Sequence, residues 1–240
     1  CRVYAAGEGI GGAPSPAMIA AALRRGARAR GELVLVRHGE TLGNSSVRLY
    51  GATDIGLSPL GEAQMRRAAD ALRGERFDRL VTSPLSRAQR SAAIVREALA
   101  EPPPLRVVDA LRERDFGSWE GWTVDEVAAR DPAGYRRWRE GGLEFAFPGG
   151  EARQEVVDRV LSALHAPGDP LFPTDARTIA VLHKGIIKVL LGALLGLDFG
   201  EYNQLPVALG SIHRLEAGEA GWRLVAGNLV DHLGDAFLES

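Results

Sequence analysis

Five polar side chains of types that bind or transfer phosphate come soon after predicted strands of this chain. They are Arg37, His38, Arg87, Glu113 and His183. In an open α/β sheet, the carboxyl ends of the strands form the crevice in which ligands bind. If the predicted strands share one sheet, these side chains meet in that crevice although they are far apart in the sequence.

Together these groups could break a phosphate ester. The planar fork of an arginine binds phosphate oxygens, a neutral imidazole can attack phosphorus, and a carboxyl group can protonate the leaving oxygen. Taken singly, His183 is more simply interpreted as a hydrogen-bonded structural residue, Arg87 as a surface ion-pair partner and Glu113 as part of an exposed charged loop. The functional interpretation therefore depends on the whole set.

The order of the predicted elements indicates an α/β fold. Short apolar runs typical of buried strands lie at 33–36, 80–81, 105–108 and 178–182. Helices are predicted at 58–72, from 84 to 99, and at 123–130, 132–140, 151–164 and 185–195. Ser58 is the expected N-cap of the first of these, with Pro59 at its first position. A hairpin ends the chain at 211–216 and 222–225. We therefore predict a three-layer α/β/α fold with a mostly parallel central sheet and a helical insertion after the loop that bears Glu113.

The composition is that of a globular protein. The 240 residues include 29 Lys and Arg and 31 Asp and Glu, a formal net charge of −2, and 45% are hydrophobic. This balance gives no electrostatic reason to expect nucleic acid as a partner, and no stretch approaches the roughly 18 apolar residues of a membrane span. We expect a cytoplasmic protein, and a homodimer stays open.

The first 31 residues differ from the rest of the chain. We interpret 1–31 as an N-terminal extension and 32–240 as one catalytic domain. Met18–Arg30 is rich in Ala and Arg and could form a short helix, whereas Gly7-x-Gly9-x-x-Gly12 lacks a preceding strand and is followed by prolines, so we do not interpret it as a nucleotide-binding loop. The single cysteine, Cys1, allows no intramolecular disulfide. Because the sequence begins with Cys rather than Met, we expect a trimmed chain, and the alternative is a lipoprotein that is anchored through an acylated Cys1.

The motifs that carry these residues resemble those of a known family. Leu35-Val36-Arg37-His38-Gly39-Glu40-Thr41, Ser83-Pro84-Leu85-Ser86-Arg87-Ala88, Leu111-Arg112-Glu113-Arg114-Asp115-Phe116-Gly117, Phe147-Pro148-Gly149-Gly150-Glu151 with Arg159, and Val181-Leu182-His183-x-Gly185 occur in this order. The ordered set is similar to that of the histidine phosphatase superfamily, the phosphoglycerate mutase-like proteins, over about residues 32 to 233.

The resemblance implies a role for each residue. His38 would be the nucleophile that becomes phosphorylated, and Arg37, Arg87 and His183 would hold the phosphoryl group. Glu113 would give a proton to the leaving alkoxide and then activate water. Asn44 would lie at the edge of the pocket, in contact with phosphate or substrate. No metal and no cofactor is expected, because two guanidinium groups and an imidazole can supply the positive charge.

Protonation adds two requirements. The attacking nitrogen of His38 must be neutral, so the other ring nitrogen is expected to donate to a backbone carbonyl. Glu113 must carry a proton when the substrate binds. Asp115 and Glu120 are the alternative acids if Glu113 points away.

Two residues depart from the pattern of the family. Lys184 stands where relatives often have Gly or Ala, and is either an exposed helix residue or a positive charge at the mouth of the pocket. Arg114 stands where many phosphatases of the family have an apolar residue. Turned inward, Arg114 could pair with a carboxylate or second phosphate of the substrate.

The expected activity is that of a phosphoric monoester hydrolase, a histidine acid-type phosphatase acting on a small phosphorylated metabolite. The first alternative is a 2,3-bisphosphoglycerate-dependent phosphoglycerate mutase. The chain lacks a Tyr-Gly-x-Leu-x-Gly-Leu-Asn-like run after Phe116-Gly117, which favours hydrolysis. The alternative outside enzymes is a protein that binds a phosphate ligand without turnover. Phosphosugars, phosphoglycerate, nucleotide-loop phosphates and phosphoserine stay open as substrates.

Overall fold

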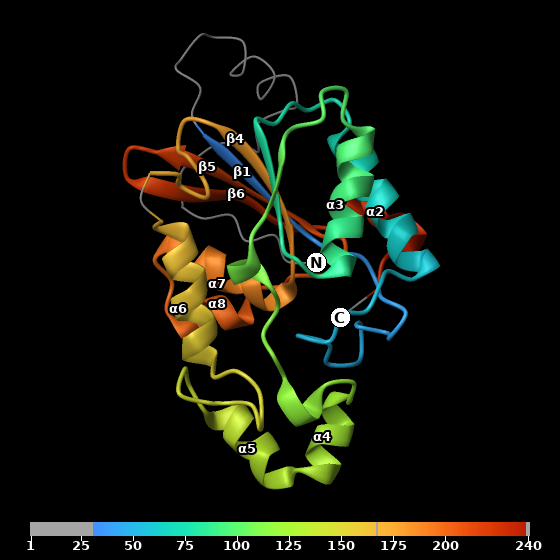
Figure 1. Ribbon diagram of the computed structural model, residues 1–240, viewed down its shortest axis with the longest axis vertical. Coiled ribbons are helices and arrows are strands. Elements are labelled where there is room, and N and C mark those ends of the chain that lie inside the picture. The colour runs from blue at the N-terminus through green and yellow to red at the C-terminus, as the bar shows by residue number, and fades with distance from the viewer. Residues whose placement is uncertain (1–30, 167, 239–240) are drawn as a thin grey trace, which may run out of the picture.

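A twisted six-stranded sheet forms the centre of the computed structural model, which describes residues 31–166 and 168–238 (Figure 1). Its strands lie in the order β3-β2-β4-β1-β5-β6. They are β1 Glu32–Arg37, β2 Arg79–Thr82, β3 Leu105–Val107, β4 Arg177–Leu182, β5 Ile212–Gly218 and β6 Gly221–Leu229. Strands β1 to β4 pair in parallel, and the β5–β6 hairpin adds antiparallel strands beside β1. The predicted mostly parallel sheet is confirmed.

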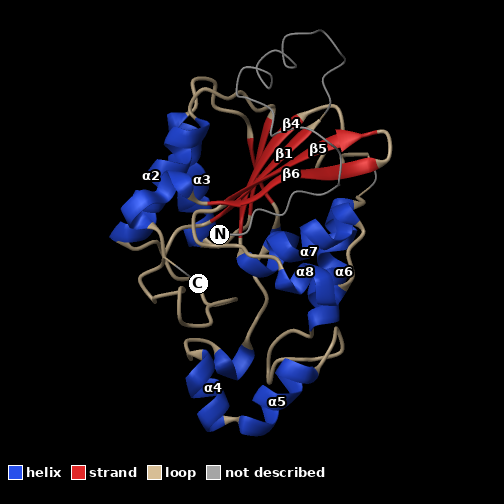
Figure 2. Ribbon diagram, turned by 180° about the vertical axis from the view of Figure 1, so that it is seen from behind, coloured by secondary structure: helices blue, strands red, loops and turns tan. Residues whose placement is uncertain are grey.

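Helices cover both faces of the sheet, on opposite sides of the strands (Figure 2). Because successive side chains of a strand point to opposite faces, Val34 and Val36 of β1 pack with α2 and α3, whereas Leu33 and Leu35 pack with α6 and α7. The helices are α2 Pro59–Leu72, α3 Ser86–Ala98, α6 Arg153–Leu164, α7 Lys184–Leu195 and α8 Phe199–Gln204. The three-layer α/β/α prediction is confirmed.

Local signals in the sequence set the ends of two of these helices. The hydroxyl of Ser58 accepts a hydrogen bond from the backbone N–H of Gly61 at 3.1 Å, and Pro59 opens α2 as predicted. Helix α7 ends at Gly196, whose φ of 69° is the left-handed conformation that glycine adopts most readily. At its other end, α7 begins directly after His183, so the start of this helix lies at the carboxyl edge of the sheet.

The predicted helical insertion is confirmed as α4 Val124–Arg130 and α5 Pro132–Glu140, which lie away from the sheet (Figures 1 and 2). It has its own aromatic core, in which Trp119, Phe145 and Phe147 are buried and contact one another. The indole N–H of Trp119 donates to Asp131, which also caps α5. The insertion therefore has a core separate from the two that cover the sheet.

Short 3₁₀ helices complete the described chain, at Asp109–Leu111, Gly117–Trp119 and Asp231–Ala236. Helix α8 was not among the predicted elements, although Asp198 and Glu201 form a capping box at its start. Helix α6 begins at Arg153 rather than at 151, because Glu151 is engaged by Asp115 and Arg159 before the helix starts. The predicted helix Met18–Arg30 and the glycine-rich segment 7–12 lie outside the described residues. No helix of the described chain has the length and apolar character needed to cross a membrane.

Candidate active site

Two neighbouring parallel strands bring the two histidines together. His38 follows the last residue of β1 and His183 follows the last residue of β4, and the backbone N–H of His38 donates to the carbonyl of Leu182 at 3.0 Å. Their ring centroids are 5.1 Å apart. Arg37, His38, Arg87 and His183 are each at most 4% exposed. We call these four residues the basic cup.

His38 has the hydrogen bond expected for a nucleophile. Its Nδ1 lies 2.7 Å from the carbonyl oxygen of Gly39. Because a carbonyl can only accept, Nδ1 carries the hydrogen and Nε2 keeps its lone pair. Burial, followed by the positive charges of Arg87 and Arg37, holds the pKa of His38 well below its usual range. The imidazole is therefore neutral at physiological pH.

Ser83 orients the second histidine. Its hydroxyl lies 2.6 Å from Nε2 of His183, and Ser83 follows the last residue of β2, the strand beside β4. Burial and the charge of Arg87 lower the pKa of His183 well below its usual range. The other ring nitrogen, Nδ1, is buried and has no hydrogen-bond partner among the described residues. Sequence reasoning assigned no role to Ser83, although its position at a strand end is the signal that singled out the other residues.

Arg87 is held by backbone carbonyls rather than by carboxylates. Its Nη1 donates to the carbonyl of Thr53 at 2.9 Å and its Nη2 to that of Gly51 at 2.7 Å. Its Nε is buried without a hydrogen-bond partner among the described residues. Arg37 is fixed in a similar way, by donation from Nη1 to the carbonyl of Val207 at 2.7 Å. Burial lowers the pKa of Arg37 to about 10, so its charge persists at neutral pH.

Glu120 anchors the loop that holds Arg87. Its carboxylate accepts from the backbone N–H groups of Gly51 and Ala52 at 3.0 and 3.1 Å and from that of Phe116 at 3.0 Å. A side chain at Gly51 would put its Cβ 1.7 Å from the carbonyl oxygen of Arg114, so only glycine fits there. Glu120 was considered as an alternative acid, but its oxygens are committed to this loop.

Glu113 lies at the start of α7, beside the basic cup. Only 6% of the residue is exposed. Its Oε2 accepts from the backbone N–H of Gly185 at 2.8 Å and its Oε1 from that of Arg114 at 2.9 Å. Its charge is near enough to Arg37 and Arg87 to act on the pKa of each guanidinium. The structure thus brings all five predicted side chains to one edge of the sheet.

The other alternative acid, Asp115, also has a structural contact. Its Oδ1 accepts from the backbone N–H of Gly117 at 2.7 Å, which closes the turn after the loop that bears Glu113. An ion pair outside the cup braces the same loop. Arg159 and Glu151 are 2.8 Å apart, Arg159 donates to the carbonyls of Ala110 and Arg112, and Glu151 accepts from the N–H of Asp115 at 3.0 Å. Sequence reasoning noted Arg159 only as part of a motif.

The remaining predicted residues occupy different surroundings. Asn44 is exposed and has a φ of 61°, and among the described contacts none joins its side chain to the basic cup. Its left-handed backbone, which asparagine tolerates better than most residues, is a structural reason for its type. Arg114 turns inward: its side chain is 16% exposed, and its Nε lies 3.9 Å from Glu113. Lys184 is half-buried at the first position of α7.

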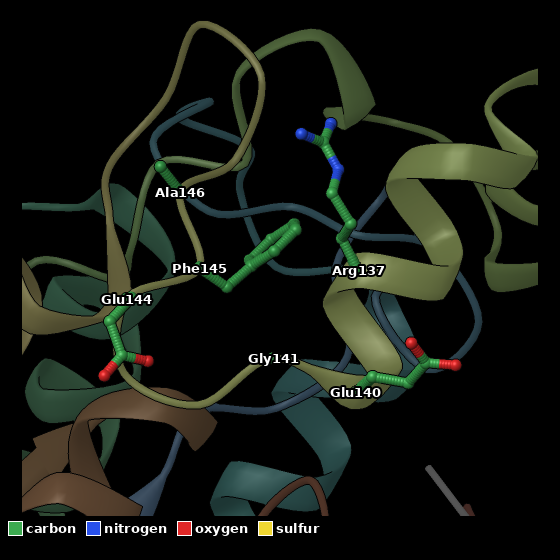
Figure 3. Close-up of a pocket in the computed structure, with 6 residues that line it drawn as sticks. All are labelled: Arg137, Glu140, Gly141, Glu144, Phe145 and Ala146. Carbon is green, nitrogen blue, oxygen red and sulfur yellow. The ribbon is translucent and has the colours of Figure 1, made fainter.

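An open pocket on the insertion is a separate feature (Figure 3). It is lined by Arg137, Glu140, Gly141, Glu144, Phe145 and Ala146. Phe145 extends toward α5, and the two glutamates lie on either side of it (Figure 3). None of the five predicted catalytic side chains lines this pocket, and its charges have both signs, so it does not have the character of a phosphate site.

Comparison with known proteins identifies the class to which this fold and site belong. Residues 33–230 match the model of the histidine phosphatase superfamily (branch 1), and the chain belongs to that family. The chain is 32% identical over 199 residues to "Uncharacterized phosphatase PhoE" of Bacillus subtilis, which covers 83% of this chain and 95% of that protein. It is 30% identical over 204 residues to "Probable phosphoglycerate mutase GpmB" of Salmonella choleraesuis, with 85% of this chain and 93% of that protein covered.

A solved structure is similar along nearly the whole described chain. Mycobacterial glucosyl-3-phosphoglycerate phosphatase superposes with a TM-score of 0.71 at 32% sequence identity, covering 85% of this chain and all of that one. The family contains phosphatases and mutases, so membership by itself does not fix the reaction or the substrate.

Proposed function

We propose that this protein is a metal-independent phosphomonoesterase that hydrolyses a small phosphorylated metabolite through a phosphohistidine at His38. The observation that carries the proposal is the basic cup. It combines a neutral nucleophilic imidazole with two buried guanidinium groups and a buried imidazole. Arg87 Nε and His183 Nδ1 are buried without a hydrogen-bond partner in the described part of the chain, and such groups suit the oxygens of a transferring phosphoryl group.

In the first step, Nε2 of His38 attacks phosphorus and forms a P–N bond. The bond between phosphorus and the alcohol oxygen breaks, and its electron pair stays on that oxygen, which takes a proton from the Glu113 carboxyl. Arg37, Arg87 and His183 stabilise the charge on the equatorial oxygens. This step leaves phosphohistidine, a free alcohol and the Glu113 carboxylate.

In the second step, the Glu113 carboxylate takes a proton from water while the water oxygen attacks phosphorus. The P–N bond breaks and its electrons return to Nε2 of His38, which restores the neutral imidazole. Inorganic phosphate is released and Glu113 is protonated again. The hydrogen bond from Nδ1 to Gly39 supports both steps, because it keeps the lone pair on Nε2.

Hydrolysis is favoured over mutase activity by the sequence after Phe116-Gly117 and by two of the similar proteins, which are named as phosphatases. A phosphoglycerate mutase is the second candidate, because the chain is also 30% identical to a protein named as one. The two reactions share the first step and differ in whether the phosphohistidine passes its phosphoryl group to water or to a second alcohol.

The test is phosphate release over a panel of metabolite phosphates, assayed in EDTA with wild type, His38→Ala and His165→Ala. His165 is an exposed histidine at the end of α6 and serves as the matched control. We expect turnover of at least one ester by wild type and His165→Ala, and a loss of at least about 10⁴-fold in His38→Ala. Turnover that disappears in EDTA, or ligand binding without phosphate release, contradicts the proposal.

A separate assay distinguishes the mutase. When 3-phosphoglycerate is incubated with a trace of 2,3-bisphosphoglycerate, we expect no conversion to 2-phosphoglycerate beyond the rate of phosphate release. Conversion to 2-phosphoglycerate at a rate above that of phosphate release would identify a mutase instead.

A further inference from the structure

The two lysines of this chain lie about one helical turn apart on the same helix. Of its 29 basic residues, 27 are arginines, and the lysines are Lys184 and Lys188. Both belong to α7, four residues apart, so they share one face of the helix. That helix begins directly after His183, and its second residue, Gly185, donates to Glu113. Both lysines therefore lie beside the proposed proton donor.

Arg114 adds a third positive charge to this face. A Cβ built on Gly185 would lie 2.7 Å from Nη2 of Arg114, so the guanidinium lies directly against the first turn of α7. Arg114 is also near enough to Lys188 to act on its pKa. We call Arg114, Lys184 and Lys188 the cation cluster.

The cluster has little compensating negative charge. Neither lysine forms an ion pair within the described chain, and the Lys188 ammonium donates to a neutral acceptor, the carbonyl of Asn203. Glu113 is the carboxylate that acts on both lysines, and its oxygens already accept two backbone N–H groups. Partial burial is the main cause that lowers the pKa of each lysine to about 8, and nearby positive charges, Arg37 among them, lower it further. An anion bound here would relieve that repulsion.

We propose that the cation cluster is an anion-binding subsite for the alcohol part of the substrate, which therefore carries a carboxylate or a second phosphate group. This inference rests on the proposed function, because it uses Glu113 to locate the leaving group. A proton donor must lie within hydrogen-bond reach of the leaving oxygen. The carbon atoms attached to that oxygen then lie next to Glu113, and an acidic group a few bonds away reaches Arg114, Lys184 and Lys188.

The residue types fit this role. A guanidinium binds carboxylates and phosphates through two parallel hydrogen bonds, and an ammonium is a compact charge with three donors. Lys188 uses one donor on Asn203 and keeps two. By contrast, the pocket of Figure 3 is lined by Arg137 together with Glu140 and Glu144, so an anion there would meet two like charges.

Matched substrates test the subsite by kinetics. 3-Phosphoglycerate and glycerol 1-phosphate differ in a carboxylate against a hydroxymethyl group, and propane-1,3-diol bisphosphate and propyl phosphate differ in a second phosphate. In each pair, we call acidic the ester whose alcohol part carries a carboxylate or a second phosphate, and neutral the ester whose alcohol part does not. Wild type is expected to prefer the acidic member of at least one pair about 10- to 100-fold in kcat/KM. The pair that shows this preference distinguishes a carboxylate subsite from a phosphate subsite. In Lys184→Met, Lys188→Met and Arg114→Met this preference should fall about 10-fold, with little change on the neutral member.

The control is Arg66→Met, which removes an exposed charge on α2 and should keep the wild-type preference. Hydrolysis by wild type without any preference for an acidic member would overturn the subsite while leaving the proposed function intact. Equal losses on both members of a pair in the three cluster variants would also overturn it, because the cations would then serve the phosphoryl group or the fold.

Chemical labelling tests the same subsite without turnover. Because the chain has two lysines, an amine-directed reagent read out by mass spectrometry reports on Lys184 and Lys188 alone among its side-chain amines. The experiment uses His38→Ala, so that the probe esters stay intact. The preferred acidic ester should slow labelling of both lysines about 10-fold at saturation, and its neutral partner should not. Equal labelling with both esters would overturn the inference even if the protein hydrolyses neither.

Discussion

The basic cup and the cation cluster lie beside each other but are built differently. The cup uses residues at or just after the ends of β1 and β4, together with Arg87 at the start of α3, and backbone carbonyls hold both of its arginines. The cluster uses a loop residue and two partly buried lysines on a helix surface. Strand ends inside a packed core hold the side chains of a site in one geometry. Residues on a loop and on a helix surface tolerate substitution, so the groups that such a site binds can vary. We infer that the cup fixes the reaction and the cluster selects the substrate.

Among substitutions that keep the nucleophile His38, the largest effect is expected from Arg87→Met, which removes a charge from the cup. Arg87 is fully buried, and the carbonyls of Gly51 and Thr53 fix its guanidinium in place. We expect kcat/KM to fall about 10³-fold on every phosphate ester, acidic or neutral. Steady-state kinetics on both kinds of ester checks this. The control is Arg90→Met, one helical turn away and exposed; a loss in Arg87→Met that depended on the alcohol would place Arg87 with the cluster.

Glu113→Gln should lower kcat by an amount that depends on the leaving group, unlike a substitution in the cup. Glutamine keeps the acceptor for the Gly185 N–H but cannot give a proton. On an alkyl phosphate, kcat should fall about 10²-fold. On p-nitrophenyl phosphate it should change little, because p-nitrophenolate leaves without protonation. Equal losses on both esters would mean that Glu113 supports the cup rather than the departing oxygen.

A smaller effect of the same kind is expected from Arg159→Met. The Arg159–Glu151 pair braces the backbone on both sides of Glu113, at Ala110, Arg112 and Asp115. Loosening this brace should lower kcat on alkyl phosphates about 10-fold through misplacement of Glu113, with p-nitrophenyl phosphate again little affected. Arg73→Met, whose exposed side chain at the end of α2 pairs with Asp70, is the matched control. A rise in KM with unchanged kcat would instead assign Arg159 to substrate binding.

Much of this site could be predicted from the sequence, because strand ends are local signals. Arg37 and His183 each follow an unbroken apolar run, and parallel strands then force them together. The contacts of Glu120 and Arg159 could not be predicted, because they join loops distant in the chain through backbone atoms that carry no sequence signal. The proximity of Lys188 to Arg114 could not be predicted either, because it depends on how the loop that bears Glu113 meets α7.

The buried histidines should make the free energy of unfolding depend on pH. The pKa values of His38 and His183 lie well below their usual range, and burial lowers the pKa of His213 to about 4. Below pH 6.5 the unfolded chain therefore binds protons that the folded protein does not, so the free energy of unfolding falls as the pH falls. His213 alone should contribute a loss of about 2 kcal/mol between pH 7 and pH 5.

Urea denaturation at pH 7 and pH 5 measures this loss, and His213→Gln should reduce it. Glutamine can still donate to the carbonyl of Pro206, as Nε2 of His213 does. Equal stability at both pH values in wild type would contradict this, because it would mean that burial does not lower the pKa values of these histidines.

The central claim is that His38 carries the phosphoryl group between substrate and water. The most direct measurement is an alkaline rapid quench of the enzyme mixed with a ³²P-labelled ester, followed by peptide mapping, because phosphohistidine survives alkali. We predict label on the peptide that contains His38, with none in His38→Ala and the wild-type amount in His165→Ala. Label on another residue, or wild-type turnover with no labelled protein at any quench time, would contradict it.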